Sequence, residues 1–170
     1  MTEAEARPDT LNDVGVLKRR EIEARIVGPL IERLGEEFGH DRVIELAGEV
    51  VIDVAKSQGA TMAEMMGGND LTFFADSMEA WTRGGALDIE IVEQSQNRFA
   101  FNVQRCKYAE MYRELGMADL GAAMSCNRDG TMVQGFNPDI EFTRTQTIMN
   151  GADHCDFVFE LPATEQPVDL

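Results

Sequence analysis

The stretch IEFTRTQTIM-NGAD-HCDFVFEL, residues 140–161, decides the fold class of this chain. Its first and third parts, residues 140–149 and 154–161, are rich in the β-branched and aromatic side chains that favour strands. The short NGAD sequence between them has the glycine and asparagine typical of a tight connection. The stretch therefore predicts a β-hairpin in the last third of the chain.

A second pair of strands is expected upstream. In residues 87–91 the apolar positions Leu87, Ile89 and Ile91 alternate with acidic ones, which is the pattern of a half-buried strand. Residues 99–103 alternate in the same way, and QSQN at 94–97 supplies a turn between the two segments. We expect four strands in all.

The N-terminal half has helical periodicity instead. Apolar residues recur at helical intervals over residues 14–38, 41–59 and 70–83, and again over 106–115. Gly28-Pro29 predicts a kink or a split in the first helix, Asp41 an N-cap for the second, and Gly59 its end. The order of elements predicts an α+β fold, with helices packed on one face of a small, mainly antiparallel sheet.

This order also predicts the domain organisation. With 170 residues, one domain is expected. Residues 1–12 read as a flexible tail, and residues 13–170 as a single domain. Within it, residues 13–85 are helical, residues 86–162 are mixed α and β, and a short C-terminal tail follows.

The charge excludes several classes of partner. The chain has 31 acidic and 15 basic residues, a net charge of −16, which disfavours binding to nucleic acid or to anionic membrane surfaces. No apolar run reaches the roughly 18–20 residues of a membrane span, and the acidic N-terminus lacks the features of a secretory signal. We expect a cytoplasmic protein that acts on a small molecule; whether it forms a homo-oligomer is left open.

The three cysteines, Cys106, Cys126 and Cys155, do not indicate a disulfide framework or a local zinc motif. Their number is odd, and no two are spaced as CxxC. We therefore expect no metal and no cofactor, although folding could still gather the three thiols, with or without a histidine, around a zinc ion.

Arg144 is the candidate for binding an anionic ligand. By strand alternation it shares a face with Ile140 and Phe142, so that a guanidinium group would point to the apolar side of the sheet and could hold a carboxylate bidentately. A rim arginine that extends to water is the alternative. Thr145 and Thr147 lie on the opposite face as candidate substrate contacts, or simply as residues that favour strands.

Cys126 is the candidate nucleophile, because it precedes the turn-like sequence Asn127-Arg128-Asp129-Gly130, where a thiol would be exposed beside a cation. Asp129 is a candidate base. Cys155 lies with two phenylalanines on one strand face, where it would contact substrate or simply pack in the core. Cys106 opens a helix, where packing is the first expectation. His154 and Asp156, on the other strand face, are the candidates for proton transfer.

The ordered set of Cys106, CNRD at 126–129, RTQT at 144–147 and GADHCDF at 151–157 resembles the L-2-amino-thiazoline-4-carboxylic acid hydrolase family. The resemblance covers the C-terminal half well and the helical half in general layout. It implies a small cytoplasmic bacterial hydrolase that acts on cyclic amidine or amide C–N bonds, with a thiazoline carboxylate as the namesake substrate.

Such a reaction needs a cation for the carboxylate, a nucleophile for the ring carbon and a proton donor for the departing nitrogen. Cys126, Asp129, His154 and Asp156 are the expected catalytic residues, and Arg144, Thr145, Thr147 and Cys155 the expected substrate contacts. Water activated by a carboxylate or by zinc is the alternative to the thiol. A non-catalytic small-acid-binding or sensory domain is the alternative function.

Overall fold

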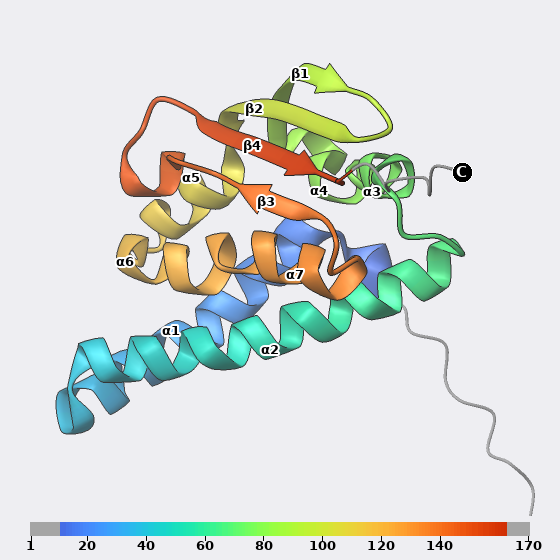
Figure 1. Cartoon of the computed structure of the whole chain (residues 1–170). Coiled ribbons are helices and arrows are strands. Elements are labelled where there is room, and N and C mark those ends of the chain that lie inside the picture. Colours follow the sequence, from blue (N-terminus) through green and yellow to red (C-terminus); the bar gives the residue numbers. More distant parts are fainter. Residues whose placement is uncertain (1–10, 163–170) are drawn as a thin grey trace, which may run out of the picture.

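Alternating apolar residues build a four-stranded antiparallel sheet, as the sequence predicted. The computed structural model describes residues 11–162 (Figure 1). The strands are β1 (Leu87–Gln94), β2 (Arg98–Cys106), β3 (Glu141–Thr143) and β4 (Cys155–Glu160), in the order β1-β2-β4-β3. The two predicted hairpins are therefore joined edge to edge through β2 and β4.

One face of the sheet carries the core. The pairs Phe99–Phe159, Phe101–Phe157 and Val103–Cys155 lie opposite one another across β2 and β4. Phe74 packs against both Phe136 and Phe159, with ring centroids 5.5 and 4.8 Å apart, so α3 (Leu71–Ser77) and α7 (Arg128–Phe136) cover this face. The α+β class and the placement of helices on one face are confirmed.

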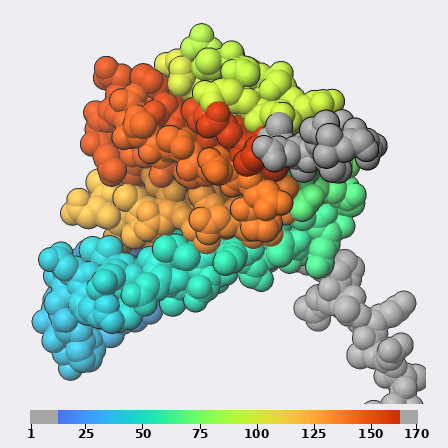
Figure 2. Space-filling view, viewed as in Figure 1, coloured from blue at the N-terminus to red at the C-terminus, as the bar shows by residue number. Residues whose placement is uncertain are grey.

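The helical half is dominated by two long helices, α1 (Val16–Phe38) and α2 (His40–Met66), which lie below the sheet in Figure 1 with α7 between α2 and the sheet. Figure 2 shows the same three layers as filled surfaces. The other helical elements are short: η1 (Leu11–Val14), α4 (Glu79–Thr82), η2 (Arg83–Gly85), α5 (Lys107–Glu114), α6 (Ala118–Gly121), η3 (Ala122–Cys126) and η4 (Ile148–Asn150).

The first predicted helix is not split, because Pro29 lies inside a continuous α1. Two predicted boundaries of the second helix were wrong. Gly59 lies inside α2, which continues to Met66 and ends at Gly67, and its N-cap is Gly39, not Asp41. A Cβ at Gly59 would lie 2.0 Å from the carbonyl oxygen of Met132. The glycine therefore serves the close approach of α2 to α7.

Two further predictions on local structure need correction. The predicted strand 140–149 ends at Thr143, and Ile148–Asn150 form a 3-10 turn. The predicted 126–130 turn is helical, because η3 leads into α7 at Arg128. Of the predicted tails, residues 1–10 and 163–170 lie outside the described residues, and η1 includes Leu11 and Asn12. Between residues 11 and 162, no helix combines the length and the apolar character needed to cross a membrane.

Candidate functional site

A cavity of about 70 Å³ lies between the sheet and the helices, and all three cysteines line it. Cys106 ends β2 and Cys155 begins β4, so the antiparallel pairing of these strands brings both thiols to one end of the sheet. Cys126 reaches the cavity from η3 on the helical side. At about 10–15 Å³ per water, the cavity has room for about five waters, or for a ligand on the scale of one small ring.

The segment that presents Cys126 is a π-helix, Ala122–Cys126, in which the N–H of Asn127 donates to the carbonyl of Ala122 over 3.0 Å. π-Helical turns are rare and are frequent at functional sites, because the extra residue changes the direction of the side chains. Here the turn places Ser125 and Cys126 next to each other on the cavity wall, immediately before α7 begins.

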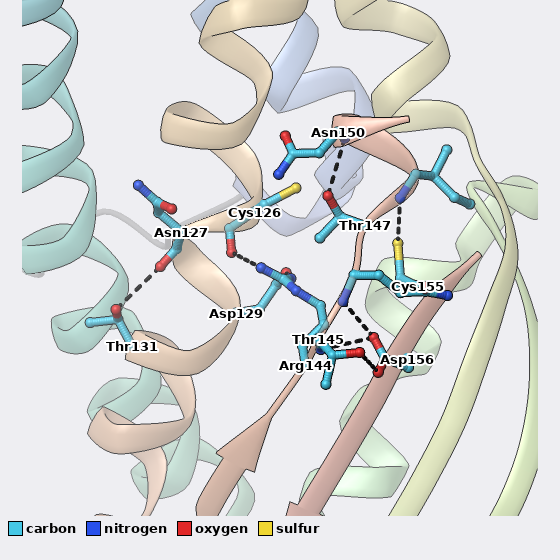
Figure 3. A network of polar contacts seen from close by, with 12 residues as sticks. Cys126, Asn127, Asp129, Thr131, Arg144, Thr145, Thr147, Asn150, Cys155 and Asp156 are labelled. Atoms are coloured by element: carbon cyan, nitrogen blue, oxygen red, sulfur yellow. Dashed lines mark hydrogen bonds and ion pairs between the residues drawn. The ribbon is translucent and has the colours of Figure 1, made fainter. Parts of the chain in front are cut away.

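Asp129 and Arg144 form an ion pair on the cavity wall (Figure 3). Asp129 lies in the first turn of α7, and Arg144 follows the last residue of β3. The Arg144 guanidinium also donates to the carbonyl of Cys126 over 3.2 Å, and it lies over the rings of Phe142 and Phe157, 5.6 and 5.2 Å from their centroids. The guanidinium group is therefore fixed by a carboxylate, a backbone carbonyl and two aromatic rings. It lies on the core face of the sheet, as strand alternation predicted.

The environment of Asp129 disfavours its charged form. Burial raises the pKa of its carboxyl to about 6, although the charge and the hydrogen bond of Arg144 act to lower it. Although 31% of its side-chain surface is accessible, the carboxyl lies deep in the protein beside the cavity. A carboxyl with a pKa near neutrality and a cation beside it is the usual arrangement of a general base or acid.

The pKa values of the thiols, in contrast, are moved away from neutral pH. Burial raises the pKa of Cys106 to about 11 and that of Cys126 to about 12, and it raises the pKa of Cys155 as well. For Cys126, the charge of Asp129 adds to this effect, and Arg144 only partly offsets it. The expectation that Cys126 is exposed in a turn with Arg128 favouring its thiolate was wrong, because Cys126 lies in a partly buried π-helix and Arg128 contacts other groups.

Four of the eight predicted site residues lie outside the cavity lining. Asp156 accepts from the backbone N–H of Thr145 and Gln146 over 3.0 and 2.8 Å and from the Thr145 hydroxyl over 2.5 Å. Burial acts to raise its pKa, but these hydrogen bonds outweigh it and lower the pKa. The imidazole of His154 lies 2.9 Å from the side-chain amide of Gln146, and the Thr147 hydroxyl accepts from the N–H of Asn150 over 3.2 Å. These contacts hold the loop between β3 and β4.

The structure brings Cys126, Asp129, Arg144 and Cys155 together, and adds two buried arginines that the sequence reasoning did not assign to the site. Arg20 and Arg128, 6% and 8% exposed, both line the cavity. A signal was present for the first: Arg20 stands at helical spacing between the apolar residues Val16 and Ala24, on the face that α1 buries. A charged residue in such a stripe is a candidate for function.

The gathered thiols do not form a metal centre. Among residues 11–162, no group of three or more histidine, cysteine, aspartate or glutamate side chains is arranged to hold a metal ion. Cys106 accepts from the N–H of Ala109 over 3.4 Å and Cys155 from the N–H of Ile148 over 3.2 Å, so two of the sulfur atoms already have backbone partners.

Residues 19–159 match the model of the L-2-amino-thiazoline-4-carboxylic acid hydrolase family. The chain belongs to this family. Every residue that lines the cavity, except Val16, lies within the part of the chain that matches the L-2-amino-thiazoline-4-carboxylic acid hydrolase family. No curated protein matches the chain.

Two solved structures share the fold of this family member at low sequence identity. The phenol-responsive sensory domain of the transcription activator PoxR, in complex with phenol, is 13% identical over 86% of this chain and 76% of its own, with a TM-score of 0.54. Subunit 3 of the trafficking protein particle complex of Naegleria fowleri, covalently bound to palmitic acid, is 9% identical over 85% of this chain and 95% of its own, with a TM-score of 0.50. Both similarities concern the fold alone.

Proposed function

We propose that this family member is a hydrolase that opens a C–N bond of a cyclic amidine or amide in a small ring-containing carboxylic acid, with Asp129 as the general base. The observation that carries the proposal is the partly buried Asp129–Arg144 pair on the wall of a cavity the size of a small ring. Membership of the L-2-amino-thiazoline-4-carboxylic acid hydrolase family supports the reaction type.

In this proposal, the ionised carboxylate of Asp129 takes a proton from a water molecule, and the water oxygen forms a bond to the sp² ring carbon. The ring C–N bond then breaks, and Asp129 returns the proton to the departing nitrogen. One water is consumed and the acid–base residue is regenerated. A pKa of about 6 suits both halves of this cycle, because at neutral pH Asp129 is ionised while its conjugate acid still donates readily.

Arg144 lines the cavity, but its guanidinium group is shared with Asp129. We assign it to holding the Asp129 carboxylate in position and to stabilising negative charge on the reacting atoms. The high pKa values of Cys106 and Cys126 favour water over a thiolate as nucleophile. Cys155 remains a proposed contact of the ring, because it lines the cavity.

The test is turnover of a panel of cyclic amidine and lactam carboxylic acids by the purified protein, followed by mass spectrometry. The proposal expects a product heavier by one water from at least one acid, with Asp129→Asn reducing the rate by about 10²–10⁴-fold. Ring opening at an unchanged rate in Asp129→Asn would contradict the assignment of the base. A panel without any product would contradict the hydrolase.

A ligand-binding or sensory domain is the second candidate function. It is favoured by the thiols, whose raised pKa values disfavour the reactive thiolate at neutral pH, and by the fold shared with the PoxR sensory domain, which binds phenol in its structure. Under this alternative, the same acids raise the melting temperature of the protein but are recovered unchanged.

A further inference from the structure

Two buried arginines on the helical side of the cavity share a single carboxylate. Arg20 of α1 donates from Nη1 to both oxygens of Glu23 over 2.8 Å. Arg128 of α7 has longer contacts: its Nη2 lies 3.4 Å from Glu23 Oε2, and its Nη1 lies 3.5 Å from Gln58 Oε1. Only its Nε has a short contact, 2.9 Å to the carbonyl of Met124. The terminal nitrogens of Arg128 are thus weakly satisfied for a buried guanidinium.

The charges of the site do not balance among the described residues. Three guanidinium groups, those of Arg20, Arg128 and Arg144, line the cavity. Asp129 is engaged by Arg144, so the two remaining cations depend on Glu23, whose side chain is 37% exposed. One positive charge is left over, on the helical side. Burying an uncompensated charge is costly, and an anion between Arg20 and Arg128 would remove that cost.

The surroundings of Arg128 agree with this imbalance. Burial and the positive charge of Arg20 lower its pKa to about 10, although Glu23 and Tyr112 act to raise it. Beside the pair lies Tyr112, which is fully buried and whose hydroxyl has no hydrogen-bond partner. Both arginines are close enough to act on the pKa of this hydroxyl, which burial raises to about 12. The unsatisfied hydroxyl of Tyr112 and the weakly satisfied guanidinium of Arg128 are therefore close to each other and to Arg20.

We propose that Arg20 and Arg128 form the carboxylate subsite of the cavity and that the ligand is a monoanionic ring acid. Its carboxylate lies between the two guanidinium groups, and its ring extends toward the thiols and the Asp129–Arg144 pair. The inference rests on the proposed function and deepens it, because it fixes which end of the substrate faces the base. It also moves the predicted role of carboxylate anchor from Arg144 to the helical side.

The experiment compares an unreactive acid with its uncharged analogue, so that binding is measured without turnover. Thiazole-4-carboxylate and thiazole-4-carboxamide have aromatic rings of the relevant size and differ by the charge. Calorimetric titration of the wild type is expected to show binding of the acid at least about tenfold tighter than binding of the amide. Arg20→Gln and Arg128→Gln are expected to abolish this preference while retaining the affinity for the amide.

Two further variants keep the test decisive if a buried arginine variant fails to fold. Glu23→Gln removes the shared counter-charge from a partly exposed position, and it is expected to increase the affinity for the acid several-fold. Arg33→Gln, also in α1 but with 70% of its side chain exposed, is the control and is expected to leave both affinities unchanged.

Three results would overturn the inference: an equal loss of acid and amide binding in Arg20→Gln and Arg128→Gln, weaker acid binding in Glu23→Gln, or loss of the acid preference in Arg144→Gln alone. The outcome is separate from that of the proposed function. An acid preference that depends on Arg20 and Arg128 in a protein that opens no ring would retain the subsite and reject the hydrolase. Ring opening by a protein whose preference for the acid does not depend on Arg20 and Arg128 would retain the hydrolase and reject the subsite.

Discussion

The guanidinium of Arg144, which follows β3, is hydrogen-bonded to the carboxylate of Asp129, which lies in the first turn of α7. The two residues are 15 positions apart in the sequence and come from different layers of the fold. Their contact joins the sheet to the helices at the wall of the cavity. It also places a carboxyl with a raised pKa beside a fixed cation.

The activity should depend on the ionised form of Asp129. Because its pKa is raised to about 6, kcat/KM for ring opening is expected to rise with pH through about 6 and then to level off. The acid limb of the pH profile, measured on the free enzyme, reports this pKa. Asp153→Asn, which changes an exposed carboxylate in the loop before β4, should leave the limb in place. A profile that is flat between pH 5 and 8 would be incompatible with Asp129 as the base.

The raised pKa of Asp129 should also make the stability of the protein depend on pH, with higher stability at lower pH. The folded-state pKa of Asp129, about 6, is above the ordinary value of about 3.9, so the folded state holds the proton more tightly than the unfolded state. This contribution to stability is fully present below about pH 4 and is lost as pH rises through about 6. Relative to Asp129→Asn, the wild type should therefore gain stability on acidification from pH 7 to 5. Urea unfolding of both proteins at the two pH values measures the difference, and an equal change in both would contradict it.

The thiols should be slow to react in the folded protein. With a pKa of about 11, Cys106 has at neutral pH on the order of 100-fold less thiolate than an ordinary cysteine, and Cys126, with a pKa of about 12, has less still. Alkylation by iodoacetamide at pH 7.5 is expected to be slower by a similar factor, and to reach the rate of a free thiol in urea. Cys126→Ser should retain turnover within about tenfold of the wild type. Complete loss of turnover in a folded Cys126→Ser would restore the thiol as nucleophile.

The packing of α2 against α7 should depend on Gly59 but not on Gly48. A Cβ at Gly59 would lie 2.0 Å from Met132 O and 2.8 Å from Phe136 N, which are backbone atoms that cannot rotate away. Gly59→Ala is therefore expected to destabilise the protein by about 1–3 kcal/mol or more. Gly48→Ala, in the same helix, meets nothing closer than 3.7 Å, and it should be neutral or stabilising by about 0.5–1 kcal/mol.

Thermal or urea unfolding of the two glycine variants provides the measurement. Because both substitutions remove a glycine from the interior of α2, the gain in helix propensity is common to them, and the difference isolates the close contact with α7. Equal effects of the two substitutions would show that the approach of α2 to α7 does not constrain position 59.

Local patterns in the sequence were enough for the sheet and for the face on which Arg144 lies. Alternation depends only on the period of a strand, so Phe99 could be assigned to the same face as Phe101, and Phe157 to the same face as Phe159, before the pairing of the two strands was known. The helix boundaries failed where tertiary contact overrode a local signal. Glycine is typical of a helix end, yet Gly59 lies inside α2 at the point where α7 packs closely against it. Pro29 likewise lies inside α1 without ending it.

The sequence by itself therefore determined the α+β class, the four strands and the family, and it supplied candidate site residues, because each follows from periodicity or from ordered motifs. Only the tertiary structure decided which of these residues meet. It gathered three distant thiols with Asp129 and Arg144, left His154 and Asp156 outside the cavity lining, and added Arg20 and Arg128 from two helices. The pKa values follow from the same packing, because burial and the distances between charges depend on segments that are far apart in the chain.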